Sequence, residues 1–216
     1  MSYQPTILVT GFEPFLGAER NPSTEAVQRL PDELLGCQIV KRELPVVWFE
    51  CVHLLEAYIE EFRPRTVLSV GQGYPTPPVL IERIGINLCN GPDNTDEVDL
   101  YDEPIFPNGP TAYFSTAPYR AMHSRLKAEG IPVRYHFEAG QNQCNCVLYS
   151  ALHFAATRYP GMTAGFLHVP MLPDAEKKIE GMALETVARA VFCCVEEAAK
   201  ALRPPVRTLE QYREDL

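Results

Sequence analysis

The sequence predicts an α/β fold in which a largely parallel sheet is covered by helices on both faces. Two short runs, residues 6–10 and 66–70, are almost wholly apolar, as strands buried on both faces are. Segments with helical periodicity alternate with such runs, and this alternation favours parallel pairing. A length of 216 residues suits one core, so we expect one domain over residues 1–216.

The first part of the chain alternates strand and helix signals. Asn21-Pro22-Ser23 can cap a helix, and Pro64 ends the next helical segment. Gly11 and Gly71 each directly follow a buried strand. Because ligand sites in parallel sheets gather beyond the strands' carboxyl ends, we expect both glycine loops to face one crevice. The expected elements are strands at 6–10, 37–44 and 66–70 and helices at 24–30 and 48–62.

The strand predicted at residues 79–88 carries a carboxylate in an unusual place. Strict alternation puts Glu82 on the same side as Leu80 and Ile84, an otherwise apolar face. Burying an unpaired charge there would cost several kcal/mol, so Glu82 should have a partner. That partner is either an Arg or Lys in a structural ion pair or a histidine that the acid orients.

The second part of the chain begins with an acidic segment, residues 90–110. Its acid spacing does not match a calcium-binding EF-hand loop, so we expect a solvated loop that covers substrate. Strand and helix signals then resume. The expected elements are helices at 119–129, 146–159 and 181–202, strands at 133–137 and 163–167, and a polar tail at 203–216.

A tight turn precedes one cysteine, Cys144. Gly140 can adopt the positive φ that a strand-to-helix turn requires. A thiol just after such a turn lies near the first turn of the next helix, where unpaired N–H groups and the helix dipole stabilise negative charge. Thiolate is the nucleophilic form, and the same N–H groups can bind an oxyanion. Cys144 is therefore a candidate nucleophile, against the alternative of one more buried cysteine.

One of the five histidines, His168, stands at the carboxyl end of an apolar strand, where α/β active sites are built. His136 falls inside the strand before the turn, and the other three lie in helical segments. By its position alone, His168 is about as well explained by a structural role as by a catalytic one. Together, Cys144, His168 and Glu82 supply the nucleophile, base and orienting acid of a cysteine triad.

Composition excludes several classes of partner. A net charge of -9 offers no electrostatic attraction to nucleic acid or an anionic membrane. The N-terminus lacks the basic and apolar regions of a secretory signal, and no apolar run approaches a membrane span. Seven cysteines without framework spacing indicate reduced thiols, so we expect a cytoplasmic protein.

Two non-hydrolytic functions remain open from the residues alone. Cys144 and Cys146 could serve a redox or metal-binding protein, although a Cys-x-Cys spacing at a helix start points the two thiols apart. A catalytically silent binding module is the other alternative, for which an inert Cys144 would be the signature.

Eight motifs in this order resemble the pyroglutamyl peptidase I family, also called pyrrolidone-carboxylate peptidase, over nearly the whole chain. They are Gly11-Phe-Glu-Pro-Phe15 with Asn21-Pro22-Ser23, Val70-Gly-Gln72, Glu82-Arg83 with Ile86-Asn87, Pro92-Asp-Asn94, Gly109-Pro-Thr-Ala-Tyr-Phe-Ser-Thr116, Ala139-Gly140, Cys144-Asn145 and Gly165-Phe-Leu-His168-Val-Pro170. The resemblance implies a three-layer α/β/α fold with a mostly parallel, twisted mixed sheet of the phosphorylase/hydrolase-like type.

The resemblance also implies a cofactor-free, metal-free cysteine exopeptidase that removes an N-terminal pyroglutamyl residue, commonly as a homotetramer. Family roles fall on Cys144 as nucleophile, His168 as base and Glu82 as orienter. Phe12 and Phe15 match the aromatic walls of the substrate pocket. Gln72 matches a loop glutamine whose amide offers the lactam both a donor and an acceptor.

Three departures from the family pattern lie near the expected site. Asn142 and Gln143 stand where apolar or aromatic pocket residues are usual. The chain is about two residues shorter between Asn87 and Pro92, which removes an arginine and an aliphatic residue. Leu16 also replaces a common glycine. We therefore expect weaker lactam binding, or a pocket completed by the acidic segment, and keep open a related cysteine amidase with altered acyl specificity.

Overall fold

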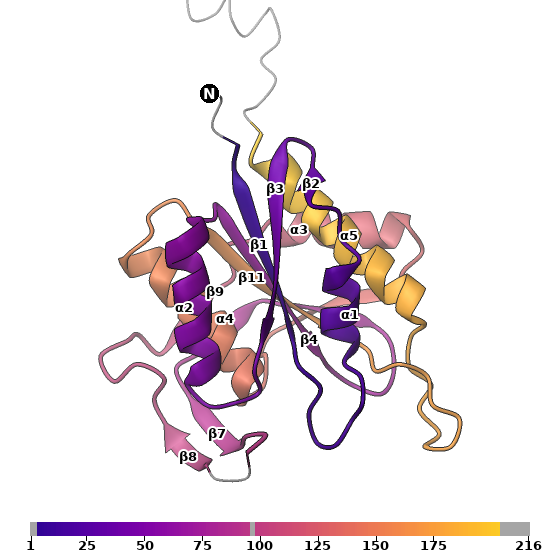
Figure 1. The fold of residues 1–216 in the computed structure, drawn as a ribbon, viewed down its shortest axis with the longest axis horizontal. Coiled ribbons are helices and arrows are strands. Elements are labelled where there is room, and N and C mark those ends of the chain that lie inside the picture. The colour runs from indigo at the N-terminus through magenta and orange to yellow at the C-terminus, as the bar shows by residue number, and fades with distance from the viewer. Residues whose placement is uncertain (1–3, 96–97, 204–216) are drawn as a thin grey trace, which may run out of the picture.

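A seven-stranded mixed sheet forms the middle layer of the protein (Figure 1). The computed structural model describes residues 4–95 and 98–203. In spatial order the strands are β10 (Val133–His136), β5 (Val79–Glu82), β11 (Thr163–Val169), β4 (Thr66–Gln72), β1 (Thr6–Phe12), β3 (Cys37–Leu44) and β2 (Glu33–Leu34). Parallel pairing joins β1 to β3 and β4, β4 to β11, and β5 to β10, whereas β11–β5 and β2–β3 are antiparallel.

Helices cover both faces of this sheet, which confirms the predicted three-layer α/β/α architecture (Figure 1). On one face lie α1 (Pro22–Gln28), α3 (Tyr119–Ala128) and α5 (Leu184–Ala201), packed on one apolar cluster. On the other face lie α2 (Glu50–Phe62) and α4 (Gln143–Thr157), packed on a second cluster. Strand β1 is buried along its whole length because it contributes side chains to both clusters.

The first helix begins earlier than the predicted residue 24. Asn21 is its N-cap: the side-chain oxygen accepts from the Ser23 N–H at 3.0 Å, and Pro22 occupies the first helical position. This helix packs tightly on β1, because a Cβ at Gly11 would lie 2.5 Å from the Thr24 Cα atom. The close approach brings the loop after β1 to the carboxyl edge of the sheet.

The prediction of one continuous strand over residues 79–88 is wrong. Strand β5 ends at Glu82, and the chain then forms β6 (Ile84–Ile86), which pairs with β9 (Ala112–Phe114) in a separate sheet. The change occurs at Arg83, whose N–H donates to the His136 carbonyl while its own carbonyl accepts from Ser115. Glu82 is therefore the last residue of its strand.

Residues 90–110 are not the irregular loop that we expected. Strands β7 (Cys89–Pro92) and β8 (Asp99–Glu103) pair antiparallel, and the hairpin projects from the body of the protein (Figure 1). Asp96 and Glu97 of the acidic segment lie outside the described residues, as does the predicted tail beyond residue 203. Within the described ranges, no helix has the length and apolarity to cross a membrane.

Candidate active site

A tight turn delivers the Cys144 thiol to the first turn of α4. Gly140 has φ +78°, as predicted, and α4 begins at Gln143, earlier than the expected residue 146. Cys144 is thus the second residue of the helix. Its N–H is one of the first four in the helix, which have no intrahelical acceptor, so the thiol and a donor for negative charge lie at one place.

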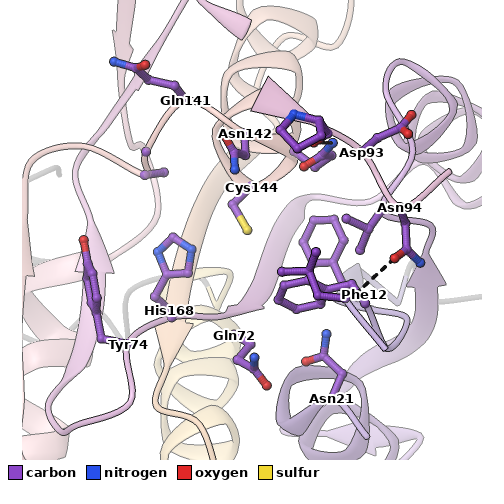
Figure 2. Close-up of a pocket in the computed structure, with 18 of the residues that line it drawn as sticks. Phe12, Asn21, Gln72, Tyr74, Asp93, Asn94, Gln141, Asn142, Cys144 and His168 are labelled. Atoms are coloured by element: carbon purple, nitrogen blue, oxygen red, sulfur yellow. Dashed lines mark hydrogen bonds between the residues drawn. The ribbon is translucent and has the colours of Figure 1, made fainter. Parts of the chain in front are cut away.

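The thiol opens into a cavity of about 370 Å³ at the carboxyl edge of the sheet (Figure 2). The loops after β1 and β4 both line this cavity, which confirms that the Gly11 and Gly71 loops face one crevice. Every predicted site residue except Glu82 is part of the lining. The predicted residues among them are Phe12, Phe15, Gln72, Asn142, Gln143, Cys144 and His168.

His168 lies between the thiol and the buried acid. Its Nδ1 atom is 2.7 Å from Oε1 of Glu82, and its ring faces the Cys144 sulfur (Figure 2). Burial alone would lower the pKa of His168. The Cys144 thiolate, through charge and a hydrogen bond, and then the Glu82 carboxylate outweigh burial and raise that pKa to about 10. The structure thus brings together the three residues of the predicted triad, with His168 held as an imidazolium.

Two glycines in the segment that ends β4 make room for this arrangement. A Cβ at Gly71 would lie 2.8 Å from the Cys144 sulfur and 2.8 Å from Cζ of Phe166. A Cβ at Gly73 would lie 3.0 Å from the His168 Cβ. The backbone of this segment therefore forms the floor against which both reactive side chains rest.

We expect Gly71→Ala to reduce kcat/KM about 10²-fold, because the added methyl group must displace the thiol from the imidazole and misplacement by about 1 Å has effects of this size. Hydrolysis kinetics would measure the change, and the thermal midpoint would show whether the variant is folded. A folded Gly71→Ala protein with wild-type kcat/KM would contradict this account of the floor.

Glu82 is fully buried and contacts two imidazoles. Besides His168, Nδ1 of His136 lies 2.9 Å from Oε2 and 3.1 Å from Oε1. Among the described residues, no Arg or Lys pairs with this carboxylate, so the structural ion pair that we kept open is not formed there. The sequence analysis missed His136, although it precedes the Gly140 turn at a strand end, the criterion that singled out His168.

The predicted substrate pocket has an apolar wall and one unengaged amide. Phe12 is buried against Phe166, with ring centroids 6.4 Å apart, and Phe15 lines the cavity beside it. Within the described chain, the side-chain amide of Gln72 makes no hydrogen bond, so its donor and its acceptor are both available. The nearby amide of Asn21 is already used by the cap and by the Glu13 carbonyl.

The two polar residues before the nucleophile differ in burial. Gln143 is buried, and its Nε2 donates to the Pro92 carbonyl at 3.4 Å. Asn142 is exposed, with its Oδ1 close to Gly91. Both therefore lie against the end of β7, and Gln143 is engaged there rather than free in the cavity.

The hairpin is fastened to the cavity rim through Asp93 and Asn94. Asp93 accepts hydrogen bonds from the Trp48 and Thr95 N–H groups, at 3.1 and 2.9 Å, and from the Thr95 hydroxyl. Burial alone would raise the pKa of Asp93, but these donors outweigh burial and lower it. The Asn94 Oδ1 accepts from the Leu16 N–H at 3.2 Å, so the hairpin and the loop after β1 form one wall (Figure 2).

The residue after the nucleophile ties α4 to the β6 segment. Asn145 is fully buried; its Oδ1 accepts from the Ile86 N–H at 2.9 Å, and its Nδ2 donates to the Ile86 and Leu88 carbonyls at 2.9 and 3.0 Å. One amide thus satisfies three backbone groups, which no apolar side chain of that size could do.

We expect Asn145→Leu to lower the free energy of unfolding by about 2–3 kcal/mol, because it leaves buried backbone polar groups without hydrogen-bond partners. Urea unfolding would measure the loss, with Asn108→Leu at an exposed position as the control, expected within about 0.5 kcal/mol of wild type. Equal stability of the two variants would show that the three hydrogen bonds contribute nothing.

Cys146 does not share the cavity with Cys144. It is fully buried, and contacts with the Cys51 and Cys89 thiols together with burial raise its pKa well above the ordinary value. A buried thiol of this kind is inert. Among residues 4–95 and 98–203, no cluster of three or more His, Cys, Asp or Glu side chains is arranged to hold a metal ion. These contacts do not support the redox or metal-binding alternative.

Comparison with known proteins gives a consistent result. The pyroglutamyl peptidase family model matches residues 5–201. A pyrrolidone-carboxylate peptidase from Thermococcus onnurineus is 41% identical over 199 residues, covering 90% of this chain and 99% of the relative. Pyrrolidone-carboxylate peptidase 2 of Photorhabdus laumondii is 39% identical over 206 residues, covering 93% and 94%.

Solved structures match the fold as closely. A mutant pyrrolidone carboxyl peptidase from Pyrococcus furiosus has a TM-score of 0.87 at 36% identity, covering 92% of this chain and 100% of that one. Pyroglutamyl peptidase I from Bacillus amyloliquefaciens has a TM-score of 0.86 at 30% identity, covering 91% and 97%.

Proposed function

This chain belongs to the pyroglutamyl peptidase family, and from that premise we propose that Cys144, His168 and Glu82 carry its reaction. The protein is a pyroglutamyl exopeptidase, which hydrolyses the amide bond after an N-terminal pyroglutamyl residue. The observation that best supports the roles is the contact series from the thiol in the cavity through His168 to Glu82, which is buried behind the lining residues.

In the first step, the Cys144 thiolate attacks the carbonyl carbon of the pyroglutamyl residue. The negative charge that develops on the carbonyl oxygen faces the first turn of α4, where the Cys144 N–H can donate to it. His168 then gives its Nε2 proton to the amide nitrogen, since Nδ1 is held by Glu82. The C–N bond breaks, the peptide leaves as an amine, and a thioester to Cys144 remains.

In the second step, water hydrolyses the thioester. Neutral His168 takes one proton from the water as the oxygen attacks the thioester carbon. The C–S bond then breaks, which restores the thiolate and the imidazolium and releases pyroglutamic acid, whose carboxyl proton passes to solvent. Glu82 keeps the Nδ1 proton in place throughout and stabilises the imidazolium whenever it forms.

The cavity offers what a small neutral lactam needs. Phe12 and Phe15 supply apolar walls, and the unengaged Gln72 amide can donate to the lactam carbonyl and accept from its N–H. A substrate lacking either group would leave one half of this amide unpaired in a dry pocket, at a cost of about 1–3 kcal/mol. That difference supports selection of pyroglutamyl over prolyl groups.

The deciding experiment compares pyroglutamyl, prolyl and glutamyl arylamides. Release of the arylamine from the pyroglutamyl amide alone is the expected result. Preference for one of the other two would favour the related cysteine amidase with altered acyl specificity. Failure to cleave any of them, with an unreactive Cys144, would favour the silent binding module.

We expect Gln72→Leu to raise KM for a pyroglutamyl amide about 30-fold with a smaller effect on kcat. The substitution keeps the side-chain size but removes both lactam hydrogen bonds, each worth about 1 kcal/mol. Steady-state kinetics on that amide would measure it. An unchanged KM would mean that Gln72 does not contact the lactam.

The proposal extends to assembly and compartment. We propose a cytoplasmic homotetramer, as the resemblance implies. The seven cysteines are all free thiols, as is typical of a reducing compartment. Exposed aromatic side chains, including Tyr101, Phe114 and Phe137, offer apolar surface for contact between subunits. Light scattering on the purified protein would test the subunit number.

A further inference from the structure

A second histidine contacts the acid of the proposed triad from the side opposite His168. In the sheet, β5 lies between β10 and β11, so Glu82 has one neighbour on each side. His136 is directly opposite Glu82 in the parallel β5–β10 register, and the Arg83 N–H supports that register by donating to the His136 carbonyl at 2.8 Å. Strand pairing therefore places the His136 backbone beside Glu82, and the hydrogen bonds to the carboxylate orient its ring.

The two imidazoles make their shortest contacts with different oxygens of the Glu82 carboxylate. His168 contacts Oε1 at 2.7 Å, whereas His136 is closer to Oε2, at 2.9 Å, than to Oε1, at 3.1 Å. Within the described residues, His136 is the only side-chain partner of Oε2. A fully buried carboxylate needs hydrogen-bond donors in place of the water that it has lost. Without His136, Oε2 would have no side-chain donor within the described residues.

We infer that His136 is a positioning residue that holds the Glu82 carboxylate in place and directed at His168, so that the catalytic series has four members: Cys144, His168, Glu82 and His136. This inference rests on the proposed triad. Both histidines then carry their proton on Nδ1, since a carboxylate only accepts. His136 acts through Glu82 and reaches the reacting atoms only through it.

Other titratable groups around His136 are few. On β5 and β11 they are Glu82 and His168. Tyr74 follows β4, and its ring meets the His136 ring edge-on with 6.3 Å between the centroids. In Figure 2, Tyr74 and Phe12 are drawn on opposite sides of His168. Glu138, two residues along from His136, lines the same cavity. Glu82 is the one of these that accepts hydrogen bonds from His136.

The test compares two replacements of similar size. Asparagine places an N–H donor where the Nδ1 of histidine was, and leucine does not. We expect His136→Leu to lower kcat about 10–100-fold with KM within about twofold, as loss of a supporting hydrogen bond does at other sites. His136→Asn should stay within about threefold of the wild-type kcat, because its side-chain N–H can still donate to Glu82.

The matched control is His123→Leu, which removes a histidine of α3 that stacks on Tyr135 outside the cavity. It should leave kcat and KM unchanged. If His136→Leu does not fold, His136→Ala replaces it, since the backbone bonds of β10 do not depend on the side chain. A wild-type kcat in the donor-less variant would overturn the inference. Equal impairment of His136→Asn would also overturn it, because it would show that packing of the ring matters and the hydrogen bond does not.

A separate readout distinguishes this inference from the proposed function. The rate of Cys144 alkylation by iodoacetamide at neutral pH reports activation of the thiol by His168 without any peptide cleavage. The donor-less variant should be alkylated more slowly than wild type, and His136→Asn at about the wild-type rate. If Cys144→Ala retains hydrolysis, the proposed function fails. If Cys144→Ala is inactive and the His136 variants behave as wild type, the His136 inference alone fails.

Discussion

Replacement of Cys144 by alanine is expected to reduce hydrolysis of a pyroglutamyl amide by about 10⁴-fold or more. The thiolate forms the covalent bond to the substrate, and removing the nucleophile of such a series costs nearly as much as removing all its members. Cys144 is the thiol in the cavity, and it lies against the Gly71 backbone and the His168 ring. Arylamine release at high enzyme concentration would measure the residual rate.

Cys37→Ala provides the control, because this cysteine lies at the start of β3, away from the cavity. It should retain wild-type kcat. One equivalent of iodoacetamide should inactivate the wild type, with the label found on the peptide that contains Cys144. Activity in Cys144→Ala, or stoichiometric labelling without loss of activity, would show that Cys144 is not the nucleophile.

The second large effect is expected from Glu82→Gln, with kcat falling about 10³–10⁴-fold. Glu82 accepts hydrogen bonds from two Nδ1 atoms, and a glutamine amide has only one oxygen with which to accept. Its NH₂ group must face one of the imidazoles and force that ring into the other tautomer. Loss of the corresponding acid in a serine triad has an effect of this size for the same reason.

The pH profile gives this substitution an independent signature. In the wild type, the pKa of His168 is about 10, so the imidazolium persists through neutral pH and is lost as the pH rises through that value. Glu82 is one of the groups that raise this pKa, so its replacement should move the alkaline fall of kcat to lower pH. Glu129→Gln, which changes a surface carboxylate paired with Arg189, serves as the control. An unshifted alkaline limb would show that Glu82 does not raise the pKa of His168.

The sequence by itself determined the layers, the order of the main elements and the candidate triad. Apolar runs such as residues 6–10 and 66–70 are local signals, because burial on both faces leaves no alternation. The Gly140 turn before Cys144 is also local, since it needs only a residue tolerant of positive φ. The resemblance added the substrate, which periodicity and spacing do not contain.

Only the tertiary structure decided where β5 ends and what surrounds Glu82. Alternation continues past Arg83 in the sequence, but the backbone there changes its hydrogen-bond partners to His136 and Ser115, which lie far along the chain. The β7–β8 hairpin was missed because its exposed residues show no alternation of burial. His136 gained its place from the register of β10 against β5, and strand register between distant segments is set by packing of the whole sheet rather than by local sequence.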